Sequence, residues 1–169
     1  MKKLSLQDQR FLDAAEGWLG LNNYQEAHNE LEQITPVYRA HPDVLKVRYE
    51  IYSMAKKWEA CFEIADSLVT MLPDDEFGWV YRSFALHELK KTEAAYDRLM
   101  PVNDKFPDNW MIPYNLACYC SQLNRFEEAA DWFKKAMALD EETVKKEAVD
   151  DPDLQPLWDS RNGTVWKRT

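Results

Sequence analysis

Apolar residues recur along the chain at spacings of four and three residues, the period of one face of an α-helix. The clearest series starts at a small residue and continues four and seven positions later; it occurs as Ala27, Leu31, Ile34; Cys61, Ala65, Leu68; Ala95, Leu99, Val102; and Ala129, Phe133, Ala136. Three positions before these starts stand Tyr24, Trp58, Thr92 and Phe126, each 34 residues after the one before. The pattern predicts four tandem helix–turn–helix repeats.

Two kinds of punctuation separate the predicted helices. Polar turns at residues 22–23, 56–57, 90–91 and 124–125 divide each repeat, and Pro-Asp pairs at 42–43, 73–74 and 107–108 separate the repeats. The first Pro-Asp pair comes three residues late in the 34-residue frame. It predicts a longer first connection and a second repeat whose leading helix is shorter by about one turn. Pro36 and Pro101 fall within second helices and predict kinks or early ends there.

The 34-residue period, the ladder of small and aromatic residues and the Pro near the repeat ends resemble the tetratricopeptide repeat (TPR) family, over about residues 8–141. The resemblance implies an all-α, right-handed α-solenoid in a single domain, with four TPR units at about residues 8–41, 42–75, 76–109 and 110–143. Two features depart from the family. Tyr49 stands where a small residue is usual, and Asn or Lys replaces the Gly of the turn within each repeat.

The repeat frame stops after residue 141. Residues 142–149 predict a polar amphipathic helix, and 153–158 a short second one, because Asp151-Pro152-Asp153 is a helix-start signal. Repeat stacks need a terminal cap over their last apolar face. We therefore expect C-terminal capping helices at residues 144–160, an ending that occurs in bacterial TPR proteins, and a tail at residues 161–169.

Composition and charge exclude several classes of protein. A net charge of −9 opposes binding of nucleic acid, and the few paired lysines are explained by solvated helix ends. The sequence has no apolar run near the roughly 20 residues that cross a bilayer, and residues 1–8 have no apolar stretch of a secretion signal. We expect a cytoplasmic protein with reduced cysteines.

No catalytic or cofactor motif stands out. The three histidines, His28, His41 and His87, have no metal-ligand or nucleophile partner at a recognisable spacing and are explained best as solvated helix residues. Cys118 and Cys120 are two apart, so on a helix they face different directions and cannot readily hold one metal ion. Phosphate-binding glycine motifs are also missing. We expect no enzyme activity, no cofactor and no metal.

The TPR resemblance places partner binding on the concave face, formed by the leading helix of each repeat. The positions carried over from the family give a partner-binding set of Leu12, Lys46, Glu50, Phe77, Val80, Phe84, His87, Met111, Tyr114 and Cys118, with Trp110 at its edge. Five of these, Phe77, Val80, Phe84, Met111 and Tyr114, are apolar residues that a bare stack would expose. The carboxylate clamp of some family members is not matched, because Leu12 and Glu16 stand at its positions.

Three occupants of this apolar surface are open. The first is a peptide or helix of a partner, which would make the protein an adaptor or a chaperone-like scaffold. The second is another copy of the chain, so that the groove is an oligomer interface. The third is the chain itself, through its capping helix or the tail residues Val165 and Trp166.

Overall fold

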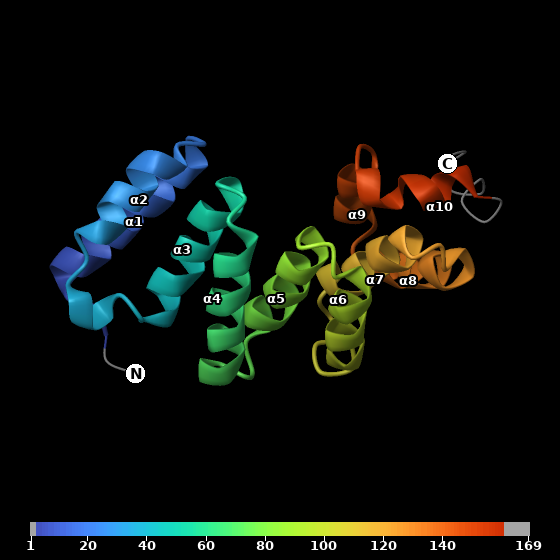
Figure 1. Ribbon diagram of the computed structural model, residues 1–169, viewed down its shortest axis with the longest axis horizontal. Coiled ribbons are helices and arrows are strands. Elements are labelled where there is room, and N and C mark those ends of the chain that lie inside the picture. Colours follow the sequence, from blue (N-terminus) through green and yellow to red (C-terminus); the bar gives the residue numbers. More distant parts are fainter. Residues whose placement is uncertain (1–2, 161–169) are drawn as a thin grey trace. The chain divides into compact units, whose positions relative to one another are not determined.

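The computed structural model describes residues 3–160, and these fold as helices joined by short turns (Figure 1). The α-helices are α1 (Leu6–Gly20), α2 (Tyr24–Glu32), α3 (Pro42–Met54), α4 (Trp58–Met71), α5 (Glu76–Glu88), α6 (Thr92–Leu99), α7 (Met111–Gln122), α8 (Phe126–Leu139), α9 (Glu141–Ala148) and α10 (Gln155–Asp159). Short 3₁₀ helices are η1 (Pro36–Tyr38), η2 (Met100–Val102) and η3 (Pro152–Leu154). The predicted all-α fold of helix–turn–helix repeats is confirmed.

The turn within each repeat has one conformation throughout. Asn22, Lys56, Lys90 and Asn124 stand 34 residues apart and adopt φ values of 59°, 54°, 62° and 60°. The next residue's amide donates to the carbonyl five positions back, as from Asn23 to Trp18 at 2.9 Å, which closes the leading helix with a Schellman motif. Glycine favours this left-handed region, which is why the family usually has Gly here. In this chain Asn and Lys adopt the same conformation, so the turn is kept without Gly.

The proline predictions hold in part. The second helices of the first and third repeats end before their prolines, and 3₁₀ turns at Pro36 and Pro101 follow. The prediction of a shortened leading helix in the second repeat is wrong, since α3 and α5 have 13 residues each. Pro42 is the first residue of α3, where its missing amide hydrogen is not needed, so it shortens nothing.

By its contacts the chain divides into two compact units, Met1–Arg82 and Ser83–Thr169, with the division inside α5. In the first unit, a core of apolar residues joins α1, α2 and α3: Leu12, Ala15, Ala27, Leu31, Ile34, Val44, Val47 and Ile51. Asp8 fixes the start of α1 to the connection after α2, because its carboxylate accepts the amide of Thr35 at 2.8 Å. Gly78 of α5 lets that helix approach the α4 backbone closely, since a Cβ there would lie 2.7 Å from the Val69 nitrogen.

Tyr49, the large residue at a small-residue position, is accommodated within the first unit. It is buried, its ring meets Phe77 edge-on at 5.7 Å, and its hydroxyl donates to the Tyr81 carbonyl at 2.9 Å. Both partners lie on α5, so a tyrosine at this position links α3 to α5 where the family would have a close helix contact.

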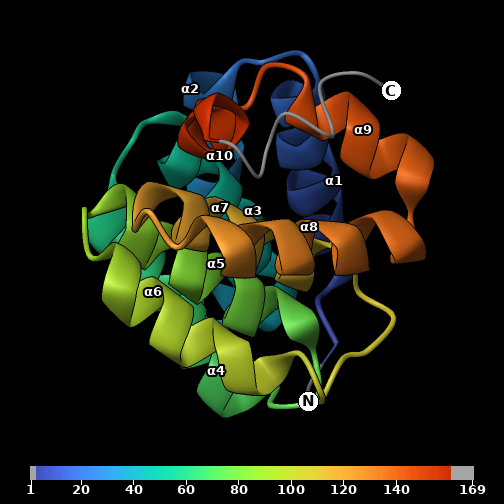
Figure 2. The same ribbon diagram turned by 90° about the vertical axis from the view of Figure 1, so that its right-hand side faces the viewer.

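In the second unit, α7 lies against α6, α8 and the C-terminal elements η3 and α10. Figure 2 shows α10 lying over α7, while α9 turns back at the end of α8. Phe133 of α8 and Trp158 of α10 meet edge-on at 5.1 Å. Asp151 opens η3 by accepting the Asp153 amide at 2.9 Å, as the helix-start signal predicts.

Candidate peptide-binding surfaces on the leading helices

The first unit carries a mixed aromatic and acidic surface on its leading helices, which we call the inner surface of unit 1 and define by Glu16, Lys46, Glu50, Phe77 and Tyr81. These residues come from α1, α3 and the start of α5. Lys46 pairs with Asp75 at 2.6 Å, and its ammonium lies 5.3 Å from the centre of the Phe77 ring. The Phe77 and Tyr81 rings are 4.3 Å apart, so they form one half-buried aromatic step.

Two carboxylates of this surface, Glu16 and Glu50, are close enough to interact electrostatically. Partial desolvation and then the charge of Glu16 raise the pKa of Glu50. Burial and then the charge of Glu50 raise the pKa of the Tyr81 hydroxyl. Within residues 3–160, no ion pair joins Glu16 or Glu50 to a cation. Like charges without a counter-charge repel, and a cation placed between them would relieve that repulsion.

Two residues assigned to the partner-binding set in the first unit are buried. Leu12 is 2% exposed and lies in the core between α1 and α2, and Val80 is 1% exposed. The expectation that they are exposed is wrong. The positions carried over from the TPR family fix the exposed face of a helix only approximately, and the side chains of Leu12 and Val80 lie in the packing between helices. Lys46, Glu50 and Phe77 keep accessible surface. Tyr81 is an addition that the carried-over positions missed.

In the second unit the leading-helix face is covered by the chain itself. Tyr114 is 7% and Cys118 4% exposed, against the expectation of exposure. The cover is the cap turn, residues 151–153: the Tyr114 hydroxyl donates to an Asp151 carboxylate oxygen at 2.6 Å, and the Cys118 thiol lies 3.5 Å from the same oxygen. Burial and the neighbouring Asp151 and Asp153 charges raise the pKa of Cys118.

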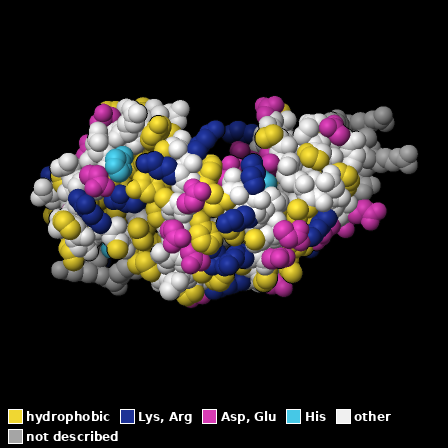
Figure 3. Space-filling model, viewed as in Figure 1, with side chains coloured by type: hydrophobic (Ala, Val, Ile, Leu, Met, Phe, Trp, Pro, Cys, Tyr) yellow, Lys and Arg dark blue, Asp and Glu magenta, His cyan; other side chains and the backbone are white. Residues whose placement is uncertain are grey.

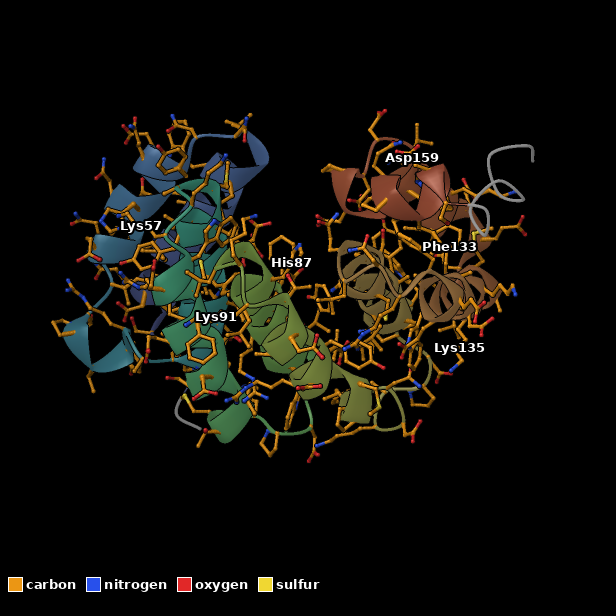
Figure 4. All side chains as sticks on the ribbon, turned by 45° about the vertical axis from the view of Figure 1, so that its right-hand side comes forward. Lys57, His87, Lys91, Phe133, Lys135 and Asp159 are labelled. Atoms are coloured by element: carbon orange, nitrogen blue, oxygen red, sulfur yellow. The ribbon has the colours of Figure 1, made fainter. Side chains whose placement is uncertain are left out.

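His87, near the C-terminal end of α5 and labelled in Figure 4, is covered by the same turn. It is 4% exposed, so its description as a solvated helix residue is wrong. Its Nε2 lies 3.0 Å from an Asp153 carboxylate oxygen and its Nδ1 lies 3.0 Å from the Thr92 hydroxyl. Its ring packs against Tyr119 with 5.0 Å between centres. Both ring nitrogens are therefore satisfied inside the second unit.

Side chains of α7 also contact the main chain of the cap. The Gln122 amide donates to the Asp153 carbonyl at 3.0 Å, and the Ser121 hydroxyl accepts the Leu157 amide at 3.1 Å. The remaining apolar candidates, Phe84, Met111 and Trp110, are half-buried. The third occupant considered from the sequence, the chain itself, thus covers Tyr114 and Cys118 through the cap turn; the tail residues Val165 and Trp166 lie outside the described residues.

Among residues 3–160, no group of three His, Cys, Asp or Glu side chains is placed to hold a metal ion. The three cysteines are free and buried, and desolvation raises the pKa of Cys61 to about 11 and of Cys120 to about 12, so their thiols stay protonated at neutral pH. Of the helices in the described part of the chain, none has the length and apolar character needed to span a membrane.

Comparison with solved structures identifies the fold. MamA from Desulfovibrio magneticus RS-1, residues 41 to the end, matches with a TM-score of 0.72 at 16% identity, over 98% of this chain and 88% of that one. TTC0263, a thermophilic TPR protein of Thermus thermophilus, matches with a TM-score of 0.71 at 16% identity, over 95% of each chain. No protein-family model matches the sequence, and no curated protein does. The chain therefore has the TPR fold that its repeats predict.

Proposed function

We propose that this protein is an interaction scaffold that binds a segment of a partner protein on the inner surface of unit 1. The TPR fold supports a scaffold, because its leading helices form extended binding surfaces. The observation that carries the location is the meeting of an aromatic step, Phe77 and Tyr81, with the uncompensated carboxylates of Glu16 and Glu50.

The chemistry of the surface favours a partner segment with a basic residue beside an apolar one. A Lys or Arg would lie between the two carboxylates and neutralise their repulsion, while an apolar or aromatic neighbour would pack on Phe77. The net charge of −9 works in the same direction, since it attracts basic segments over longer distances.

Selection of peptides from a random library tests this proposal. Peptides selected on the wild-type chain should lose at least about tenfold in affinity for a Glu16→Gln/Glu50→Gln variant, which corresponds to the loss of a charge-assisted contact. The matched control is Glu59→Gln/Glu63→Gln, which makes the same charge change on exposed positions of the trailing helix α4. Selected peptides that bind both variants equally well would place the binding site elsewhere.

Self-association is the second candidate, and the structure gives it weaker support. The most exposed large apolar side chains, Leu6, Leu21, Val37 and Val149, belong to separate helices and turns. Figure 3 likewise shows charged side chains of both signs interspersed with apolar ones over the face in view. Light scattering at high protein concentration separates the candidates, because a monomer would eliminate the oligomer interface.

A further inference from the structure

The cap turn is bound to the second unit as a peptide ligand is bound, through both its side chains and its main chain. Asp151 accepts from Tyr114 and Cys118, and Asp153 lies 3.0 Å from the His87 ring nitrogen. Gln122 donates to the carbonyl of Asp153. Hydrogen bonds to the main chain of a segment, combined with contacts to its alternate side chains, are one way in which proteins recognise peptides.

A cap that served only to cover apolar surface would need Asp151 to start η3, but it would need neither a second carboxylate beside His87 nor the donors around Asp151. Leu154 and Leu157 already supply apolar cover and are 0% exposed. Placing two carboxylates against a largely buried face costs stability unless donors receive them, and here Tyr114, Cys118 and His87 stand on that face at the positions where the family frame places partner contacts. Tyr114 and Cys118 lie against the Asp151 carboxylate, and His87 lies against the Asp153 carboxylate.

We propose that the leading-helix face of unit 2 is a recognition site for a short acidic turn of the form Asp-Pro-Asp followed by an apolar residue, and that the cap turn is its built-in occupant. A partner segment of the same chemistry enters by displacing the cap turn. The inference rests on the proposed scaffold function, but it concerns a different surface and a partner of opposite charge. A tethered occupant competes at an effective concentration of the order of millimolar, so the site is closed to weak acidic ligands.

The test uses the full chain and a labelled peptide of residues 149–160 as the probe. The variant Asp151→Asn/Asp153→Asn should speed amide exchange over residues 150–159 and bind the added peptide about tenfold to hundredfold more tightly than the wild type, because the charged contacts of the resident cap are lost. Asp150→Asn, an exposed neighbour with the same charge change, is the matched control and should behave as the wild type. A probe carrying Asn at both positions should bind at least about tenfold more weakly.

Three results would overturn the proposal: unchanged exchange in the double variant, faster exchange without tighter peptide binding, and equal binding of the Asp and Asn probes. If the double variant loses helical content, Tyr114→Phe replaces it, since it removes one hydroxyl from the site and should still speed exchange at residues 150–153. None of these variants touches Glu16 or Glu50, so failure here and failure of peptide binding on the inner surface of unit 1 are separate outcomes.

Discussion

The two compact units are built from the same kind of helix pair and the same turn, yet carboxylates meet their leading helices in different ways. In the described part of unit 1, Glu16 and Glu50 form no ion pair with a cation, and desolvation and then the charge of Glu16 raise the pKa of Glu50. In unit 2, Asp151 and Asp153 each meet donors of the leading helices within the same unit. Among the described residues of unit 1, the carboxylates of Glu16 and Glu50 lack a counter-charge, whereas in unit 2 the leading helices supply hydrogen-bond donors to the carboxylates of the C-terminal segment.

The difference shows what decides whether a repeat surface is available for a partner. The 34-residue repeat places equivalent residues on the same helix face in both units, but it does not determine which other part of the chain lies against that face. A buried carboxylate is tolerated only where donors are arranged around it, and an exposed one remains free to attract a cation. Each of the following changes shifts one side of this comparison.

The largest effect is expected from opening the cover of unit 2 with Leu157→Ala. Leu157 is 0% exposed on α10, which packs against α7. Its truncation should cost about 2–5 kcal/mol in unfolding free energy. Thiol labelling should become faster at Cys118 than at Cys61, which lies in unit 1. Val149→Ala is the control, because Val149 is 75% exposed. Destabilisation without faster labelling of Cys118 would mean that the cap is not what covers it.

The next effect concerns the helix packing behind the surface of unit 1. Gly78→Ala places a Cβ 2.7 Å from the backbone nitrogen of Val69, which cannot move aside as a side chain can. We expect a loss of about 1–3 kcal/mol in denaturant unfolding, despite the better helix propensity of Ala. Gly17→Ala on α1 has nothing within 4 Å of the new Cβ and should instead stabilise by about 0.5–1 kcal/mol. Equal effects of the two changes would contradict the close approach at Gly78.

The architecture could be predicted from the sequence because its signals are local and repeated. The turn positions recur every 34 residues, and the positive φ of Lys56 and Lys90 at the family's glycine position shows that the frame identifies the turn even without Gly. The prediction of a shortened helix is wrong for a local reason: Pro42 has a favourable place at a helix start, so it begins α3 rather than delaying it.

The surfaces are harder to predict because they depend on distant parts of the chain. Nothing near Tyr114 or His87 in the sequence indicates that residues 151–153 fold over them. The available signal is the surplus of acid in Asp151-Pro152-Asp153, where one carboxylate is enough to start a helix. Leu12 and Val80 fail for another reason, since a shift of one position on a helix turns a side chain by about 100° from surface to core.

A smaller effect is expected from the turns, where the two units should respond alike. Lys56→Gly in unit 1 and Lys90→Gly in unit 2 each relieve a left-handed non-glycine residue. Part of this gain is offset by the greater freedom of Gly in the unfolded chain, which leaves about 0.5–1 kcal/mol of stabilisation in thermal unfolding. Asn22→Gly should give less, because Asn tolerates this conformation. A gain confined to one unit would show that the turns contribute to the difference between the units.

The smallest effects are on the pH dependence of stability in unit 1, where two carboxylates should act with opposite signs. The folded-state pKa of Glu50 is raised above its ordinary value of 4.5, so the unfolded chain releases this proton first and stability falls as pH rises through that window. Glu50→Gln should therefore be slightly more stable than the wild type at neutral pH, with a difference that vanishes as pH falls toward 4.5.

Asp8 is the opposite case, because hydrogen bonds from Ser5 and Thr35 lower its pKa below 3.8. Asp8→Asn should therefore be less stable than the wild type at neutral pH and converge with it in acid. Melting temperatures of the three chains from about pH 3 to 8 check both signs. A Glu50→Gln chain less stable than the wild type at neutral pH would mean that Glu50 already has its partner, and that the inner surface of unit 1 has no charge left to attract one.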